Sequence, residues 1–277
     1  MNESTAQPAR MACVQRITLY PIKSLDGVSV SQAHIAPGGS LEHDRAFAIV
    51  DAQGKFVNGK RLAEVHRLRA RFDLDTHTVT LADSGTLAPR RFRLDRDLQS
   101  MAAWLGEFFG FPVAIRQDSR AGFPDDTNAS GPTVISAATL AAVSAWFPGA
   151  APESMRLRFR ANLELDGVPA FWEDRLFGEP GTLVDFNVGE VAFEGVNPCQ
   201  RCVVPARDPQ SGTEEAGFQK TLAMRREQTL PDWAARSRFN HYYRLAVNTR
   251  IPASEAGKTL RVGDEVTILG VRRANDE

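Results

Sequence analysis

The chain has 277 residues, 43% of them hydrophobic and 24% charged, which suits a globular protein of one large or two small domains. Its formal net charge of -1 argues against a dedicated nucleic-acid-binding protein, which would carry an excess of basic residues. No apolar run is long enough to cross a bilayer. Three cysteines without a signal peptide indicate a reducing cytoplasm, so we expect a cytoplasmic protein with no membrane or nucleic-acid partner.

The first third of the chain is rich in short predicted strands, in which apolar and polar residues alternate. These strands cover residues 14–20, 28–35, 45–50, 55–57, 68–74, 78–81, 91–94 and 113–116. A hairpin turn is predicted at Asp51–Gly54. A helix is predicted over 98–109, where Met101, Trp104 and Leu105 recur at helical spacing. Short strands about ten residues apart are typical of a β-barrel or sandwich.

The rest of the chain mixes helices and strands. After a polar loop at residues 118–131, a helix is predicted over 136–147 with Ser136 as its N-cap. Residues 219–236 are compatible with a polar helix broken at Pro231. Further strands are predicted over residues 159–165, 182–186, 190–193, 203–205, 243–248 and 266–269. We therefore expect a mainly β fold with a few helices (α+β), and we find no nucleotide-binding or α/β-hydrolase signature.

The most informative motif is the segment Asn197-Pro-Cys-Gln-Arg-Cys-Val-Val-Pro-Ala-Arg-Asp-Pro-Gln-Ser-Gly212. It holds Cys199 and Cys202, with Arg201 directly before the second cysteine. A guanidinium beside a thiol favours the thiolate, which is the form that attacks electrophiles or binds soft metals. The segment from Asp208 onward predicts a turn. We therefore expect a reactive sulfur at the end of a strand, just before a turn.

The cysteine motif alone leaves several chemistries open. A structural zinc site needs four ligands, yet the only other cysteine is Cys13 and the five histidines form no closely spaced pair. A dithiol redox pair normally opens a helix, whereas residues 203–205 predict a strand. The remaining alternatives are one metal thiolate with a bystander, or two buried structural cysteines.

Three further polar motifs lie at the ends of predicted strands, where a site would be built. Tyr20-Pro-Ile-Lys-Ser24 ends the first strand and His43-Asp-Arg45 opens the third. Phe159-Arg-Ala-Asn162 is predicted to place Arg160 and Asn162 on one face of a strand, because they are two residues apart. Each motif alone is ordinary, since charged residues at strand ends are usually just solvated.

Together with the cysteine motif and Arg261-Val-Gly-Asp264, these motifs resemble the MOSC family, in the same order over about residues 14–269. The resemblance is to the subgroup with an N-terminal MOSC β-barrel region, which includes the mitochondrial amidoxime-reducing components and bacterial reductases of N-hydroxylated bases. It implies a β-barrel-like N-terminal region at residues 13–125. It also implies a β-barrel MOSC domain at residues 126–272 that carries the cysteine motif.

The resemblance further implies a molybdenum cofactor, Mo-molybdopterin, bound between the two halves. Its metal would be held by the pterin dithiolene and by the thiolate of Cys202, the catalytic residue, whereas Cys199 is not a ligand in the family. Soft sulfur donors suit molybdenum in this role, and arginine and lysine suit the cofactor's phosphate. The positions that match residues contacting the cofactor are Lys23, Ser24, Arg45, Ser130, Arg160, Asn162, Arg201 and Tyr242.

The implied activity is the two-electron reduction of N-hydroxylated small molecules such as hydroxylamines, amidoximes or modified bases. The sequence has no plant-type ferredoxin cysteine run. Electrons would therefore come from a separate donor, such as a ferredoxin, a cytochrome b5-like protein or a flavin reductase. The family is also associated with pyridoxal phosphate binding. The alternatives are a carrier of the cofactor, or of a persulfide on Cys202, without redox turnover, and a β-barrel without a cofactor.

Overall fold

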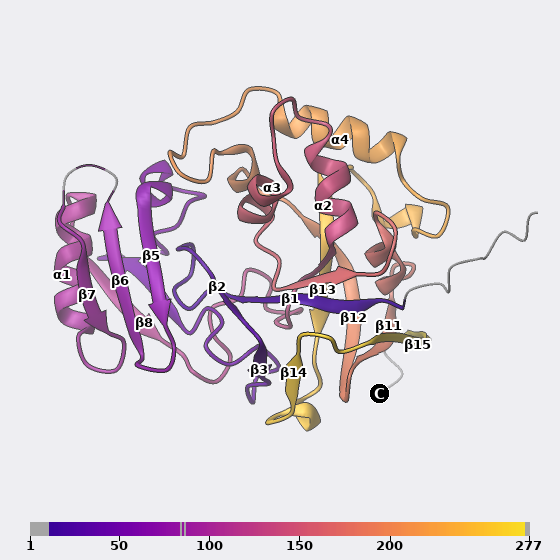
Figure 1. Cartoon of the computed structure of the whole chain (residues 1–277), viewed down its shortest axis with the longest axis horizontal. Coiled ribbons are helices and arrows are strands. Elements are labelled where there is room, and N and C mark those ends of the chain that lie inside the picture. The colour runs from indigo at the N-terminus through magenta and orange to yellow at the C-terminus, as the bar shows by residue number, and fades with distance from the viewer. Residues whose placement is uncertain (1–10, 84, 86, 275–277) are drawn as a thin grey trace, which may run out of the picture.

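The computed structural model describes residues 11–83, 85 and 87–274. In this part of the chain the protein is mainly β, with fifteen strands and four α-helices (Figure 1). This confirms the predicted α+β class. Among the described residues, no helix has both the length and the apolar character that a bilayer crossing requires.

The largest element is an eight-stranded sheet, here called the main sheet, with the strand order β15-β11-β12-β13-β9-β10-β1-β2. Its neighbours pair antiparallel except for β9 and β10, which are parallel. The strands are β1 (Cys13–Leu19), β2 (Val28–Val30), β9 (Val134–Ser136), β10 (Leu163–Asp166), β11 (Thr182–Val188), β12 (Val191–Gln200), β13 (Arg244–Arg250) and β15 (Val266–Arg273).

A second, smaller unit lies to the left in Figure 1 and is called the N-terminal unit. Its apolar core includes Phe92, Met101 and Leu105. Helix α1 turns Met101 and Leu105 into this core, as their helical spacing predicts, and ends at Gly110 with φ 73°. Its elements are β4 (Phe47–Asp51) paired with β8 (Val113–Gln117), the sheet of β5 (Leu68–Asp73), β6 (Thr78–Asp83) and β7 (Arg90–Arg93), and α1 (Leu98–Phe109).

The start of the chain belongs to the main sheet rather than to the N-terminal unit. Strand β1 lies between β10 and β2, and β3 (Gln32–His34) pairs with β14 (Thr259–Arg261) near the end of the chain. A bulge between Val14 and Arg16 shifts the alternation of β1, so Val14 and Ile17 both face the core. Because these residues pack in the same core as Leu163 and Phe186, the two halves of the sequence are interlocked.

Helices cover the upper side of the main sheet in Figure 1. Ser136 caps α2 as predicted, because its hydroxyl accepts a hydrogen bond from the Thr139 amide at 3.1 Å. The helices on this side are α2 (Ala137–Ser144), α3 (Pro152–Phe159) and α4 (Phe218–Gln228). Elsewhere in the fold the described chain forms short 3-10 helices η1 (Ala63–Arg67), η2 (Trp172–Leu176), η3 (Val204–Ala206), η4 (Arg236–Arg238) and η5 (Ala253–Glu255).

Two strand predictions near the site were wrong. Residues 159–162 are not extended, because α3 runs to Phe159 and Arg160 caps it in the left-handed conformation, with φ 53°. Strand β10 begins only at Leu163. Residues 203–205 enter η3 instead of a strand, since Pro205 suits the first turn of a helix. Arg160 and Asn162 therefore do not share a strand face.

Candidate functional site

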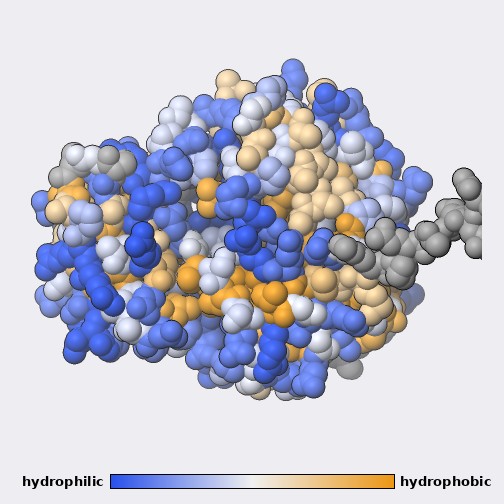
Figure 2. Space-filling view, viewed as in Figure 1, coloured by the Kyte–Doolittle hydropathy of each residue, from blue (hydrophilic) through white to orange (hydrophobic). Residues whose placement is uncertain are grey.

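A cavity of about 1250 Å³ is lined by residues of both the N-terminal unit and the main sheet. Ten lysine and arginine side chains line it, against four aspartates. Figure 2 shows hydrophilic side chains around the hollow between the two parts of the molecule. Because the whole chain has a formal charge of only -1, positive charge is concentrated here, which favours an anionic ligand.

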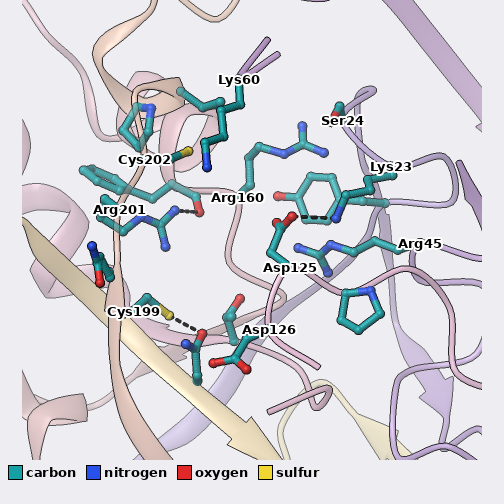
Figure 3. Close-up of a pocket in the computed structure, with 18 of the residues that line it drawn as sticks. Lys23, Ser24, Arg45, Lys60, Asp125, Asp126, Arg160, Cys199, Arg201 and Cys202 are labelled. Carbon is teal, nitrogen blue, oxygen red and sulfur yellow. Dashed lines mark hydrogen bonds and ion pairs between the residues drawn. The ribbon is translucent and has the colours of Figure 1, made fainter. Parts of the chain in front are cut away.

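The first cationic group consists of Lys23, Arg45 and Arg160, which lie near one another in the cavity (Figure 3). The guanidinium carbons of Arg160 and Arg45 lie over the Tyr20 ring, 4.1 and 5.5 Å from its centroid. Burial raises the pKa of Tyr20 although both arginines oppose it, so the ring stays neutral and attracts cations through its face. Arg160 also donates to the Leu25 carbonyl at 2.7 Å.

Lys23 has its counter-ion in the polar loop that precedes β9. Its ammonium donates to the Phe123 carbonyl at 2.9 Å and lies 2.5 Å from the Asp125 carboxylate. Lys23 is 7% exposed, and burial lowers its pKa although Asp125 opposes the shift. The Asp125 side chain is exposed to solvent in the open cavity. The protein atoms around it act to raise its pKa, but Lys23 and Arg45 outweigh them and hold that pKa below its usual range. An aspartate therefore neutralises part of the first cationic group.

Three of the predicted site residues adopt a backbone conformation that side chains rarely occupy. Ser24, Arg45 and Arg160 have φ values of 75°, 50° and 53°. Each such conformation costs about 1 kcal/mol or more and persists only where the surroundings enforce it. Here the amide of Arg45 donates to the Tyr20 carbonyl at 2.8 Å and that of Arg160 to the Arg156 carbonyl at 2.9 Å. Backbone strain of this kind is concentrated at functional sites.

Asn162 and Ser130 serve the site in different ways. Asn162 is 1% exposed and lies behind the cavity wall. Its side-chain oxygen accepts from Arg45 at 3.3 Å and from the Thr133 amide at 3.2 Å, so it positions Arg45. Ser130 lines the cavity itself and donates to the Gly38 carbonyl at 3.2 Å.

The two motif cysteines have opposite environments. Strand β12 ends at Gln200, and Cys202 follows it as an exposed residue of the cavity wall, as expected for a sulfur at a strand end. Cys199 is 3% exposed, and its thiol donates to the side-chain oxygen of Asn248. Burial raises the pKa of Cys199 to about 11, although Arg201 opposes the shift. Cys199 is therefore a neutral thiol near pH 7, whereas Cys202 is open to ligands.

Two contacts hold the cysteine segment in place. The Arg201 guanidinium donates to the Phe159 carbonyl at the end of α3, at 2.5 Å. The turn after the motif is capped by Asp208, whose carboxylate accepts from the Ser211 amide at 2.8 Å. Gly212 closes this turn with φ 75°, and a Cβ there would lie 2.3 Å from the Ala63 carbonyl of η1. The predicted turn thus packs directly on the N-terminal unit's side of the cavity.

The structure does not bring every predicted residue to the cavity. Tyr242 stacks on Phe239, with ring centroids 5.7 Å apart, and packs against the core of the main sheet. Conversely, sequence analysis missed basic residues that the fold adds to the cavity wall. These are Lys60, Arg69, Arg158, Arg207, Arg238 and Arg244. Arg207 lies inside the cysteine motif, but nothing in the local pattern of the sequence shows that these side chains share one cavity.

Comparison with known proteins identifies the family. Residues 11–111 match the family model of the MOSC N-terminal beta barrel domain, and residues 128–267 match that of the MOSC domain. The chain belongs to the MOSC domain family.

Three relatives of the chain are insect proteins. The molybdenum cofactor sulfurase of Drosophila grimshawi is 25% identical over 300 residues, covering 96% of this chain and 36% of that protein. Molybdenum cofactor sulfurase 2 of Culex quinquefasciatus is 24% identical over 256 residues, covering 76% of this chain and 32% of that protein. Molybdenum cofactor sulfurase 1 of Aedes aegypti is 35% identical over 72 residues, 26% of this chain and 9% of that protein. This chain therefore spans about a third of the length of the first two.

Proposed function

We propose that the protein binds the molybdenum cofactor and reduces N-hydroxylated compounds, with Cys202 as the protein's ligand to the metal. One observation carries the proposal: an exposed thiol and a cluster of buried and half-buried cations line the same cavity. Membership of the MOSC family and the names of the relatives support a role connected with this cofactor.

The residues present fit the cofactor. Cys202 offers an accessible soft donor, whereas Cys199 is buried, hydrogen-bonded to Asn248 and, with a pKa of about 11, protonated. Lys23, Arg45 and Arg160 offer charged donors to a phosphate. When bound, the cofactor would supply two-electron redox chemistry, and the protein would supply orientation and electrostatics.

The protein's own residues divide this work. Arg45 and Arg160 would hold the anionic end of the cofactor, with Asn162 fixing Arg45 and the Tyr20 ring supporting both guanidinium groups. Lys23 would join them once its ion pair with Asp125 loosens. Cys202 stands on an open part of the wall, so that a substrate and a separate electron donor can approach. That donor would be a ferredoxin, a cytochrome b5-like protein or a flavin reductase.

The proposal is tested by turnover. Cofactor-loaded protein supplied with a chemical reductant should reduce benzamidoxime or a hydroxylaminopurine. Cys202→Ser should not, because a hydroxyl is a hard and poorly ionised replacement for a thiolate. Loaded protein that reduces no N-hydroxylated compound would rule out the reductase role.

A second candidate function is transfer of the cofactor, or of sulfur carried as a persulfide on Cys202, to another protein. The names of the relatives and the exposure of Cys202 favour it. Incubation of the loaded or persulfidated protein with an apo-acceptor enzyme separates the two. Acceptor activation without reduction of any N-hydroxylated compound would establish the carrier function instead.

A further inference from the structure

The cavity has a second cationic group, made of Lys60, Arg69 and Arg207, which the proposed cofactor site does not use. In the first group, Lys23 and Arg45 are already paired with Asp125 and Asp44. In the second, Arg69 pairs with Asp26 at 3.3 Å, and among the residues that the structure describes Lys60 and Arg207 have no acidic partner. Lys60 and Arg207 therefore contribute positive charge to the cavity wall that no carboxylate in the described chain neutralises.

Arg207 is the strongest evidence for a ligand at this place. It follows η3, five residues after Cys202, and lines the cavity. Its guanidinium makes no hydrogen bond or ion pair to any residue that the structure describes, and its Nε is buried without a partner. A buried donor without an acceptor destabilises the folded protein, so an arginine in this state is suited to bind an anion.

Other basic residues of the cavity add to the positive charge of Arg207. Arg69 is held by the Pro209 carbonyl at 3.1 Å, and its Nε is likewise buried without a partner. His66 also lines the cavity. Burial, then Arg207 and Arg160, lower its pKa. Lys60 is exposed, and within the described chain it has no hydrogen-bond or ion-pair partner.

Figure 3 shows how Lys60 and the first group are placed relative to the sulfur of Cys202. Lys60 lies on the same side of the cavity as Cys202, whereas Lys23 and Arg45 lie on the other side, with Arg160 between them. An anion bound near Lys60 would therefore lie on the Cys202 side, away from the position proposed for the cofactor's phosphate.

We propose that Lys60, Arg69 and Arg207 form a second anion subsite that binds a carboxylate or phosphate group of the substrate. The preferred substrates would then be N-hydroxylated compounds with an anionic substituent. This inference rests on the proposed reductase function, because it assigns a substrate class to the same cavity. Arg207 supplies planar paired donors and Lys60 a mobile charge, which together suit either anion.

The test compares two substrates with the same reacting group, benzamidoxime and 4-carboxybenzamidoxime, on cofactor-loaded protein. Wild type should show a kcat/KM for the carboxylated compound at least roughly tenfold higher. In the double variant Lys60→Gln/Arg207→Gln this preference should disappear through a rise in KM. Lys55→Gln, which removes a lysine outside the cavity, should retain it. Equal preference in the double variant and wild type would overturn the subsite.

A binding measurement keeps this result separate from the reductase proposal. Calorimetric titration of loaded protein with inorganic phosphate should show one site, retained in Lys55→Gln and lost in the double variant at unchanged molybdenum content. If benzamidoxime is not reduced at all, the reductase proposal fails while the titration still decides the subsite. If the bound cofactor is a dinucleotide form and its occupancy falls in the double variant, the subsite binds the cofactor. That result would overturn the proposed substrate role.

Discussion

At the scale of single residues, Cys199 and Cys202 differ in burial and reactivity although they are only three positions apart in the sequence. Strand β12 buries Cys199 against Asn248, and the chain leaves the sheet before Cys202. Burial stabilises the neutral thiol of Cys199, because a thiolate would lose its hydration. The asymmetry favours one thiolate ligand with a structural companion over a dithiol pair.

We expect alkylation to reveal this asymmetry directly. Iodoacetamide at pH 8 should modify Cys202 in the folded protein and leave Cys199 intact, because Cys199 is buried and stays protonated until the pH approaches its pKa of about 11. Peptide mass spectrometry measures the two sites, and urea-denatured protein, in which both should react, is the control. Equal labelling in the folded state would contradict the structure's burial of Cys199.

At the scale of elements, the end of α3 joins local backbone geometry to the site. Arg160 closes the helix with φ 53°, and this left-handed turn carries its guanidinium to Tyr20 and Leu25. Arg201 donates to the last carbonyl of the same helix, that of Phe159. One helix end thus orients both a cation of the first group and the segment that carries Cys202.

Arg160→Gly should separate the structural and binding roles of this position. Glycine tolerates the left-handed conformation, which relieves about 1 kcal/mol of strain and offsets part of the lost Leu25 hydrogen bond. We expect Arg160→Gly to melt at or above the temperature of Arg160→Ala. Both variants should lose cofactor affinity by about tenfold or more, because a phosphate contact to arginine is removed. Full molybdenum content with early melting in both would show that Arg160 is structural only.

The 3-10 helix η2 contains a carboxyl group whose titration should set part of the pH dependence of stability. Glu173 is 1% exposed, and burial, together with Asp174, raises its pKa from 4.5 to about 7. As the pH rises above 4.5 the unfolded chain releases this proton before the folded protein does. The stability contributed by the protonated group therefore falls between about pH 4.5 and 7 and is constant above.

Glu173→Gln should remove this loss of stability with rising pH. We expect its free energy of unfolding to exceed that of wild type by up to about 3 kcal/mol at pH 8, with little difference at pH 4. Urea titration at both pH values measures the effect, and Glu227→Gln on the exposed face of α4 is the matched control. A variant that is less stable than wild type at pH 8 would mean that the charged form of Glu173 is stabilised in the fold.

At the scale of the whole molecule, the first strand ties the two halves together. Strand β1 fills the position between β10 and β2, and its Val14, Ile17 and Leu19 lie in the core of the main sheet. We therefore expect a fragment of residues 126–272 to lack cooperative unfolding when expressed alone, because an edge of β10 and part of its core would be exposed. Thermal unfolding followed by circular dichroism measures this, with co-expressed residues 11–125 as the rescue. A cooperative transition in the lone fragment would contradict the interlocked fold.

Predictions from the sequence were correct for elements whose structure follows from the local pattern of side chains. Alternation predicted most strands, and helical spacing predicted α1 within its observed bounds. It failed at residues 159–162, where alternation of apolar side chains suggested a strand but the left-handed turn at Arg160 ends a helix. The β3–β14 pairing joins residues more than 200 positions apart, so no local signal could indicate it. Likewise, only the tertiary fold brings Lys60 to the same cavity as Cys202.

The proposed function requires that Cys202 hold the molybdenum of a pterin cofactor. The measurement that tests it most directly is the molybdenum and pterin content per chain of protein made in a host with an intact cofactor pathway. We expect both to be near one per chain in wild type and in Cys199→Ser, and the metal to be largely lost in Cys202→Ser. Wild type that contains neither metal nor pterin, or equal loss in the two cysteine variants, would contradict the account.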